Sequence, residues 1–298
     1  MVDSGAVSLS PVIRPLLPAD VPAAAAVGGA ALSDQIPAEF LPSTPIERAH
    51  VVRRQQARVA HLLGTDPDGV WVAELAGEVV GVALGLVRED VWGLSLLGVR
   101  PGLQGQGIGG PLLRAALAYS DGRRGAIILS STDPRAMRSY ARAGFAIRPA
   151  LAAAGQINRS RIPDGLRSRP GDPTADAELL DAASRHARGA SHRRDLQAFL
   201  NAGDRLLVLD GRGFAIHRGG SPILVAAFDP EGAADLMWSC LADGPAGGTV
   251  HVDYVTAGND WAVEVALDAG LALSPDGPVF VRGDTGPLAP YLPSGAYL

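Results

Sequence analysis

Apolar and polar positions in the first half of the chain follow helix and strand patterns in turn. The stretch TPIE at 44–47 is a capping box with proline at the first helical position, and it predicts a helix that ends near Leu63. Three β-rich runs follow, VWVAELAG, EVVGVALGLV and VWGLSLLGV, separated by short turns at 76–77 and 88–90. The pattern predicts helices followed by an antiparallel meander.

A helix, a strand and a second helix are predicted after the meander, from PLLRAALAYSD, GAIILSS and DPRAMRSYARAG. In the last of these, Asp133 is placed to cap the helix N-terminus and Gly144 to end it. The second half of the chain repeats this order of elements. The spacing D-x-x-A-x-x-x-Y-x-x-x-G-F at 133–145 recurs as N-x-x-A-x-x-x-A-x-x-x-G-L at 259–271, which predicts a tandem duplication.

Between the halves, the stretch from about 149 to 175 is rich in Pro, Gly, Arg and Asp, which indicates a linker or a long connection. We expect domains at 1–155 and 176–298 joined by a linker at 156–175. The fold class is then α/β of the α+β kind, with two similar domains. Each is expected to hold a mixed, mainly antiparallel sheet flanked by helices.

Composition and charge narrow the function classes. The chain has 298 residues, 47% of them hydrophobic and 19% charged, which suits a globular protein of two domains. A net charge of -5 argues against a nucleic-acid partner. The single cysteine, Cys240, excludes an internal disulfide framework and a cysteine-based metal cluster, and no metal site is expected. With no secretory pattern and no apolar run long enough to cross a bilayer, we expect a cytoplasmic protein without a membrane partner.

The stretch GVRPGLQGQGIGG at 98–110 joins a strand to a helix and predicts an anion site. Backbone N–H groups of a glycine-rich turn at a helix N-terminus favour phosphate. A flexible surface turn is the simpler alternative. The spacing Gly105-x-Gly107-x-x-Gly110, with Asp133 further on, also satisfies a dinucleotide fingerprint and keeps NAD open. Against NAD, this loop follows an antiparallel meander rather than the first strand of a parallel sheet.

Gln104-x-x-Gly107-x-Gly109 resembles the pyrophosphate loop of the GNAT (GCN5-related) N-acetyltransferases. The resemblance spans about the first 150 residues, and it implies acetyl-CoA or a related acyl-CoA as cofactor. It implies that the main chain of Leu97 to Val99 pairs with the pantetheine amides. The residues implied to contact the cofactor are Leu97, Gly98, Val99, Gln104, Gly105, Gln106, Gly107, Ile108, Gly109, Gly110, Asp133 and Ala136. Asp133 departs from the family, which often has Asn there.

Acetyl transfer also needs a proton for the leaving thiolate and a polarised carbonyl. A backbone N–H near Val99 is the candidate for polarising the carbonyl, and Tyr140 is the candidate acid, at a position where many GNAT enzymes carry a tyrosine. A tyrosine that only packs the helix against the sheet is the alternative. No carboxylate lies on VWGLSLLGV, and Ser95 could only relay a water, so the base is open. Similarity to the enhanced intracellular survival acetyltransferases, also tandem GNAT proteins, makes the C-terminal carboxylate of Leu298 a candidate, docked by an apolar, aromatic tail.

The second half is expected to lack a working site. The stretch FDPEG at 228–232 replaces the glycine loop, and Ala266 stands where Tyr140 stands. His186 and His192, in RHARGASHRR, fit no common zinc spacing and predict a solvated basic helix face.

Together these patterns predict an N-acetyltransferase that transfers acetyl directly from acetyl-CoA to a primary amine of a small molecule or peptide. The alternatives are a non-catalytic acyl-CoA sensor and, third, an NAD-dependent oxidoreductase. Oligomeric state is left open.

Overall fold

A computed structural model describes residues 10–33 and 41–298. The chain divides into two compact units, one of Met1–Leu86 with Leu96–Asp121 and one of Val87–Ser95 with Gly122–Leu298. These bounds differ from the predicted domains 1–155 and 176–298, which stay a prediction. The absence of a secretory pattern was inferred partly from residues 1–9, which lie outside the described residues.

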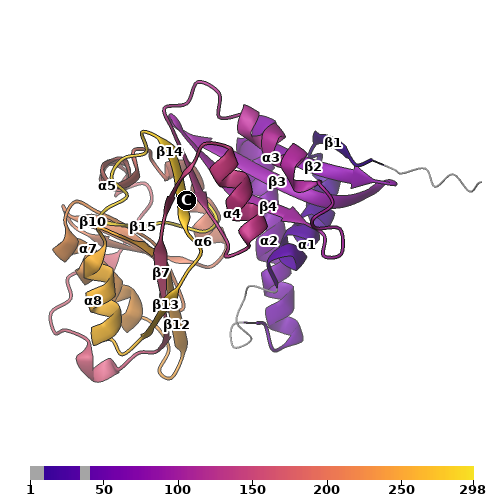
Figure 1. Cartoon of the computed structure of the whole chain (residues 1–298). Coiled ribbons are helices and arrows are strands. Elements are labelled where there is room, and N and C mark those ends of the chain that lie inside the picture. The colour runs from indigo at the N-terminus through magenta and orange to yellow at the C-terminus, as the bar shows by residue number, and fades with distance from the viewer. Residues whose placement is uncertain (1–9, 34–40) are drawn as a thin grey trace, which may run out of the picture. The chain divides into compact units, whose positions relative to one another are not determined.

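The first unit holds the predicted helices and meander (Figure 1). Its strands run in the order β1-β2-β3-β4, with β1 antiparallel to β2 and β2 antiparallel to β3. The elements are β1 (Val12–Pro15), a 3-10 turn (Pro18–Asp20), α1 (Val21–Leu32), α2 (Pro45–Thr65), a 3-10 turn (Pro67–Gly69), β2 (Val70–Leu75), β3 (Glu78–Arg88), β4 (Val91–Val99) and α3 (Gly109–Ala118). Strands β3 and β4 each continue into the second unit.

The predicted capping box starts α2. The Glu47 N–H donates to Thr44 Oγ1 over 3.1 Å, and the Thr44 N–H donates to Glu47 Oε2 over 3.2 Å. Each of these two side-chain oxygens accepts a backbone N–H that has no backbone partner at the start of a helix.

In the second unit, β4 pairs in parallel with β5 (Gly125–Leu129), and the sheet order continues β4-β5-β14-β6. Strand β14 (Val279–Gly283), from the end of the chain, is antiparallel to both β5 and β6 (Ala146–Arg148). It therefore fills the slot between two strands of the first half. Helix α4 (Pro134–Arg142) lies between β5 and β6 in sequence.

The reverse insertion occurs in a three-stranded sheet of order β12-β7-β13. Strand β7 (Ala150–Gln156), from the first half, pairs antiparallel with β12 (Thr249–Thr256) and with β13 (Ala272–Pro275). We call this reciprocal placement of β7 and β14 the strand exchange. The composition of 149–175 indicated a linker or a long connection, but residues 150–156 form a strand.

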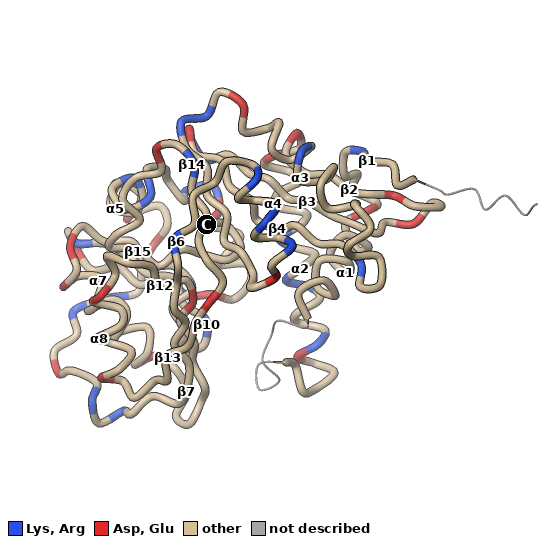
Figure 2. Tube along the Cα trace, in the orientation of Figure 1, with Lys and Arg blue, Asp and Glu red and all other residues tan. Residues whose placement is uncertain are grey.

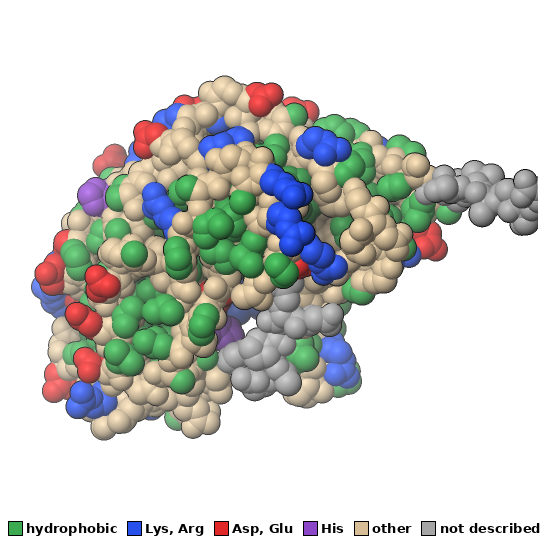
Figure 3. Space-filling view, in the orientation of Figure 1, with side chains coloured by type: hydrophobic (Ala, Val, Ile, Leu, Met, Phe, Trp, Pro, Cys, Tyr) green, Lys and Arg blue, Asp and Glu red, His purple; other side chains and the backbone are tan. Residues whose placement is uncertain are grey.

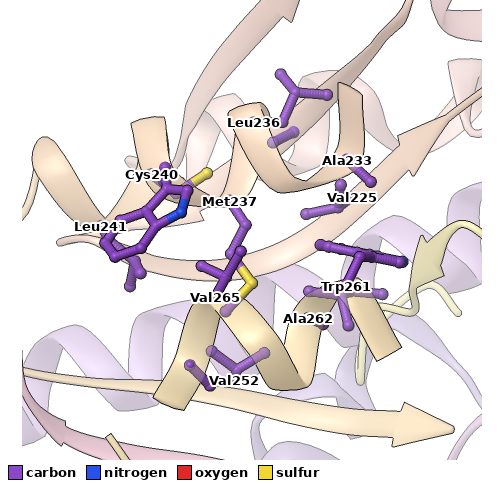
Figure 4. Packing of buried hydrophobic residues seen from close by; sticks show 14 of the residues in the cluster. Val225, Ala233, Leu236, Met237, Cys240, Leu241, Val252, Trp261, Ala262 and Val265 are labelled. Carbon is purple, nitrogen blue, oxygen red and sulfur yellow. The ribbon is translucent and has the colours of Figure 1, made fainter. Parts of the chain in front are cut away.

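A five-stranded sheet of order β15-β11-β10-β9-β8 completes the second unit, with its core packed under α7 and α8. Buried side chains from both helices and from β11 and β12 meet in this core, among them Leu236, Met237 and Trp261 (Figure 4). The elements are a 3-10 turn (Arg159–Arg161), β8 (Arg169–Pro170), α5 (Ala177–Arg188), α6 (Arg193–Asn201), β9 (Arg205–Leu209), β10 (Gly213–Arg218), β11 (Ser221–Ala227), α7 (Pro230–Ala242), α8 (Asp260–Asp268) and β15 (Tyr291–Leu292).

Helices α4 and α8 end in the same way, as the repeated spacing predicts. Gly144 and Gly270 adopt φ values of +85° and +84°. The next N–H bonds back into the helix in each case, from Phe145 to Tyr140 O over 3.3 Å and from Leu271 to Ala266 O over 2.9 Å. The fold class is confirmed: sheets that are mainly antiparallel, flanked by helices. Across residues 10–33 and 41–298, no helix combines the length and apolar character needed to span a membrane.

Candidate active site

The segment that joins β4 to α3, residues 100–108, is called the glycine loop below. It is tied to the end of the meander within the first unit. The Arg100 N–H donates to Val80 O over 2.8 Å, and the Leu103 N–H donates to Arg100 O over 3.0 Å. The Gln104 side chain donates from Nε2 to Val99 O over 3.1 Å. The loop therefore leaves β4 in a defined turn.

Three glycines of the loop adopt left-handed backbone angles. Their φ values are +85° at Gly102, +78° at Gly105 and +84° at Gly107. A Cβ at any of them would meet nothing within 4 Å, so space does not require glycine there. The backbone conformation does, because side chains other than glycine are strained at positive φ.

This conformation leaves a run of backbone donors next to the start of α3. Among the described residues, the N–H groups of Gly105, Gln106, Gly107 and Ile108 donate to no protein acceptor. The positive end of the helix dipole lies at the same point of the chain, at Gly109. Free N–H groups on bare backbone at a helix start are what a phosphate group binds.

The end of β4, where Leu97, Gly98 and Val99 lie, is shaped by its neighbours. Pairing of β4 with β5 covers Val91 to Leu94. Helix α1 approaches Gly98 so closely that a Cβ there would come within 3.0 Å of the Ala31 Cβ. Glycine at 98 therefore allows α1 to pack against the strand.

In the second unit, α4 carries the predicted residues Asp133, Ala136 and Tyr140. Asp133 caps the helix by accepting the Arg135 N–H over 2.8 Å, and its carboxylate also forms an ion pair with the Arg135 guanidinium at 2.8 Å. The hydrogen bond from the Arg135 side chain holds the Asp133 pKa below its usual value. The Asp133 carboxylate is therefore charged and already bonded to Arg135. An Asn at this position, as the family resemblance leads one to expect, would be neutral.

Tyr140 is packed into the second unit with only 5% of its surface exposed. Its ring meets Phe280 of β14 edge to face, with ring centroids 5.3 Å apart. The hydroxyl forms no hydrogen bond with the described residues. Burial, and secondly the charge of Asp133, raise the pKa of the phenol. It therefore stays protonated at neutral pH, and the exchanged strand β14 fixes its ring.

The outward face of α4 is basic. Arg135, Arg138 and Arg142 are all exposed, at helical spacing. Figure 2 shows the basic positions following one another along α4, and Figure 3 shows basic side chains gathered in a stripe over it. Arg138 and Arg142 form no ion pair within the part of the chain that the structure describes.

The last residues of the chain are docked inside the second unit. Leu298 is 1% exposed, and its carbonyl oxygen accepts hydrogen bonds of 2.7 Å from Arg188 Nη1 and from the Tyr291 hydroxyl. Two residues earlier, Ala296 O accepts a hydrogen bond of 2.6 Å from Ser95 Oγ of β4. The expectation that this tail docks is confirmed. A role for Leu298 in catalysis stays a prediction.

The prediction of a solvated basic helix face over RHARGASHRR was wrong for two of its basic residues. Arg188 and His192 are each 1% exposed, whereas His186 is exposed. Gly189 ends α5 with a φ of +84°, so His192 starts a separate turn that leads into α6. There His192 Nε2 lies 2.7 Å from the Tyr291 hydroxyl. The glycine was the signal for this break, because it separates the two halves of the stretch.

The start of α7 differs from the glycine loop as the sequence predicts. The Asp229 carboxylate accepts the Gly232 N–H over 2.8 Å and also a hydrogen bond from Arg212 Nε over 3.0 Å. A protein carboxylate thus occupies the place where an anion would bind. Ala266, the counterpart of Tyr140, is buried in the core.

The protein class follows from comparison of these features with known families. Residues 34–145 match the model of the acetyltransferase (GNAT) family, and this region includes the meander, the glycine loop and α4. This region of the chain is therefore similar to the GNAT acetyltransferases. None of the curated proteins is a match for the sequence.

Three solved structures share the fold of nearly the whole chain. A proposed acetyltransferase from Pyrococcus horikoshii superposes with a TM-score of 0.76 at 17% identity, covering 97% of this chain and 96% of the other. A GCN5-related N-acetyltransferase from Sphaerobacter thermophilus gives 0.55 at 15% identity, with coverages of 92% and 96%. A tandem GNAT protein from the clavulanic acid biosynthesis pathway gives 0.54 at 15% identity, with coverages of 92% and 99%. At these identities the likeness shows the fold.

Proposed function

We propose that the protein is an acetyl-CoA-dependent N-acetyltransferase that transfers acetyl directly to a primary amine of a small molecule or peptide. The observation that carries this proposal is the run of free N–H groups from Gly105 to Ile108 at the start of α3. Acetyl-CoA supplies an activated acetyl thioester and carries a pyrophosphate, the group that such a run of amides binds. The family match over 34–145 supports the same co-substrate.

The residues assigned to the co-substrate are those of the glycine loop and the end of β4. The amides of Gln104 to Gly110 would hold the pyrophosphate. The main chain of Leu97 to Val99 would pair with the pantetheine arm, and the Val99 N–H would polarise the acetyl carbonyl.

Tyr140 is the proposed acid. A thiolate leaving group needs a proton, and the raised pKa keeps the Tyr140 hydroxyl protonated. The hydroxyl has no hydrogen bond to the described residues that would have to be broken first.

The base is the remaining role in the proposed reaction. The Ser95 hydroxyl donates a hydrogen bond to Ala296 O, which opposes a role as a simple water relay. We retain the Leu298 carboxylate as the candidate. Because Leu298 O already accepts a hydrogen bond from Arg188 Nη1, we assign the carboxylate the role of orienting the amine or a water. Deleting the last two residues should lower turnover, and unchanged turnover would exclude this role.

Calorimetric titration with acetyl-CoA, and separately with NAD(H), tests the function. We compare the native chain with Gly107→Glu, which places a carboxylate among the free amides. Gly122→Glu is the matched control, since Gly122 also has a positive φ, of +76°, and open space around it. We expect acetyl-CoA binding that Gly107→Glu weakens about 100-fold or more and Gly122→Glu leaves intact. Binding of NAD(H) instead of acetyl-CoA would overturn the proposal.

A second measurement separates the enzyme from an acyl-CoA sensor. Release of free thiol from acetyl-CoA is followed with a panel of primary amines. Amine-dependent release supports the enzyme. Binding without thiol release, over a panel that includes small amines, aminoglycosides and peptides, would favour the acyl-CoA sensor. The lack of a carboxylate on β4 is the feature that supports this alternative.

A further inference from the structure

A pocket lined mainly by residues with charged side chains lies in the second unit. It has a volume of about 390 Å³. Its walls come from the turn between β3 and β4, from α5, and from the start of α6. None of its lining residues belongs to the glycine loop or to α4.

Among the described residues, most of the arginines that line the pocket are paired with a carboxylate, but one is not. Four arginines line it, and three of them have an acidic partner. The pairs are Arg88 with the buried Asp195, Arg185 with Glu89, and Arg193 with Asp181. Arg194 is exposed and forms no hydrogen bond or ion pair with the described residues. The pocket therefore carries an excess of one positive charge.

The acidic side chains that line the pocket are already bonded to groups other than Arg194. Glu89 accepts hydrogen bonds of 2.8 and 2.6 Å from Arg185 and one of 3.3 Å from the Ser191 N–H. Asp181 accepts a hydrogen bond from the Ser191 hydroxyl and forms an ion pair with the Arg193 guanidinium. Each carboxylate is thus engaged by at least two groups, and the walls of the pocket are cross-linked.

The arginines are only partly used by these pairs. The side chains of Arg185 and Arg193 are 52% and 57% exposed. A guanidinium has five N–H donors in a planar fork that matches the oxygens of a carboxylate or a phosphate. Arg193 and Arg194, at the first turn of α6, both line this pocket, so their remaining donors can serve one ligand.

We propose that this pocket is a binding site for a small molecule that carries an oxyanion, a phosphate or a carboxylate, and that Arg194 is its principal contact. Arg193 and Arg185 would supply further donors without leaving their acidic partners. The site goes beyond the proposed acetyl transfer and does not depend on it. Such a ligand would bind to the β3–β4 turn, the turn that leads into the strand carrying Ser95 and Leu97.

The experiment titrates inorganic phosphate and, separately, succinate into the protein and follows binding by calorimetry. Phosphate could also occupy the glycine loop, so every titration is done in the Gly107→Glu background, which makes the outcome independent of the acetyl-CoA proposal. The test variant is Arg194→Gln, which breaks no bond of the described structure and should fold normally. The matched control is Arg142→Gln, another exposed arginine that forms no ion pair with the described residues.

We expect saturable binding of one of the two anions, weakened about tenfold by Arg194→Gln and unchanged by Arg142→Gln. Stronger binding of phosphate would assign the pocket to phosphorylated ligands, and stronger binding of succinate would assign it to carboxylates. Either result supports the site. The proposal is overturned if neither anion binds, or if Arg194→Gln binds both anions as tightly as its parent.

Discussion

The N-termini of α3 and α7 follow equivalent strands but differ in their backbone N–H groups. We call the first start open, because its N–H groups have no protein acceptor in the described part of the chain, and the second closed, because a carboxylate already binds there. The glycine loop leads into α3 with four consecutive N–H groups that have no protein acceptor among the described residues. At α7, by contrast, the Asp229 carboxylate already accepts the Gly232 N–H and pairs with Arg212. The second start satisfies its helix from within the chain. The first leaves its N–H groups for a ligand to bind. The helix start in the first half of the chain therefore serves binding, and the one in the second half serves stability.

The same contrast holds one helix later. At the start of α4, Asp133 makes a local cap with Arg135 near the surface. At the start of α8, Asn259 is fully buried and holds distant segments. It donates to Leu288 O over 3.0 Å, and it accepts from the Tyr291 N–H over 2.9 Å. The second half uses the equivalent position to anchor the end of the chain.

The largest expected effect breaks this anchor. Asn259→Ala leaves a buried N–H and a buried carbonyl without partners, and we expect it to lower the free energy of unfolding by about 3 kcal/mol. Asp133→Ala, at the equivalent exposed cap, should cost about 1 kcal/mol or less. Urea unfolding of both variants measures the difference. Equal losses would show that the two caps are energetically alike.

The next effect concerns Tyr140, which has no counterpart in α8. Tyr140→Phe removes the proposed proton donor and keeps the ring against Phe280, so kcat should fall about 100-fold while the urea midpoint stays unchanged. Tyr119→Phe, which removes a hydroxyl next to the end of α3, is the control and should keep full turnover. A Tyr140→Phe enzyme with native turnover would reduce Tyr140 to a packing residue.

Opening the closed helix start should have a smaller effect. Asp229→Ala removes the cap of α7 and the partner of Arg212, and we expect a loss of about 1–2 kcal/mol in the free energy of unfolding. It should not create an acetyl-CoA site. Measured in the Gly107→Glu background, any recovery of acetyl-CoA binding would contradict the view that the glycine backbone is required.

The smallest effect is a dependence on pH. Burial, followed by the charges of Arg188 and Arg88, lowers the pKa of His192 well below its usual value. The unfolded chain, with a histidine pKa near 6.5, then binds the proton more readily than the folded chain. The stability from neutral His192 is complete above about pH 6.5 and falls at lower pH, by about 1.4 kcal/mol per pH unit.

Urea unfolding at pH 7.5 and 5.5 measures this contribution. His192→Gln should remove it, and His186→Gln, at an exposed histidine of the same stretch, should keep it. The idea fails if the two variants show the same pH dependence as the native chain.

Local signals predicted the local structure well. The capping box at Thr44, the meander and the glycine that ends α4 each act over a few residues, and each has the predicted form. The duplication could be found because Gly144 and Gly270 terminate their helices by the same backbone bonds.

What the sequence did not reveal depends on partners far apart in the chain. Strand β7 pairs with residues about a hundred positions later, and nothing within 150–156 distinguishes that pairing from a linker. Arg188 and His192 are residue types that usually lie at the surface, yet contacts with the tail residues Tyr291 and Leu298 bury them. Polar residues of this kind are assigned to the core only when their distant partner is known.

The strand exchange has a consequence for the order in which the protein can be completed during synthesis. Strand β14 is made about 130 residues after β6, and until then the facing edges of β5 and β6 have no strand between them. Strand β7, made earlier, must wait for β12 and β13. During synthesis the first sheet can therefore close only after β14 has been made, and unpaired strand edges are exposed until that moment. A truncated message that ends before Val279 would leave those edges open permanently.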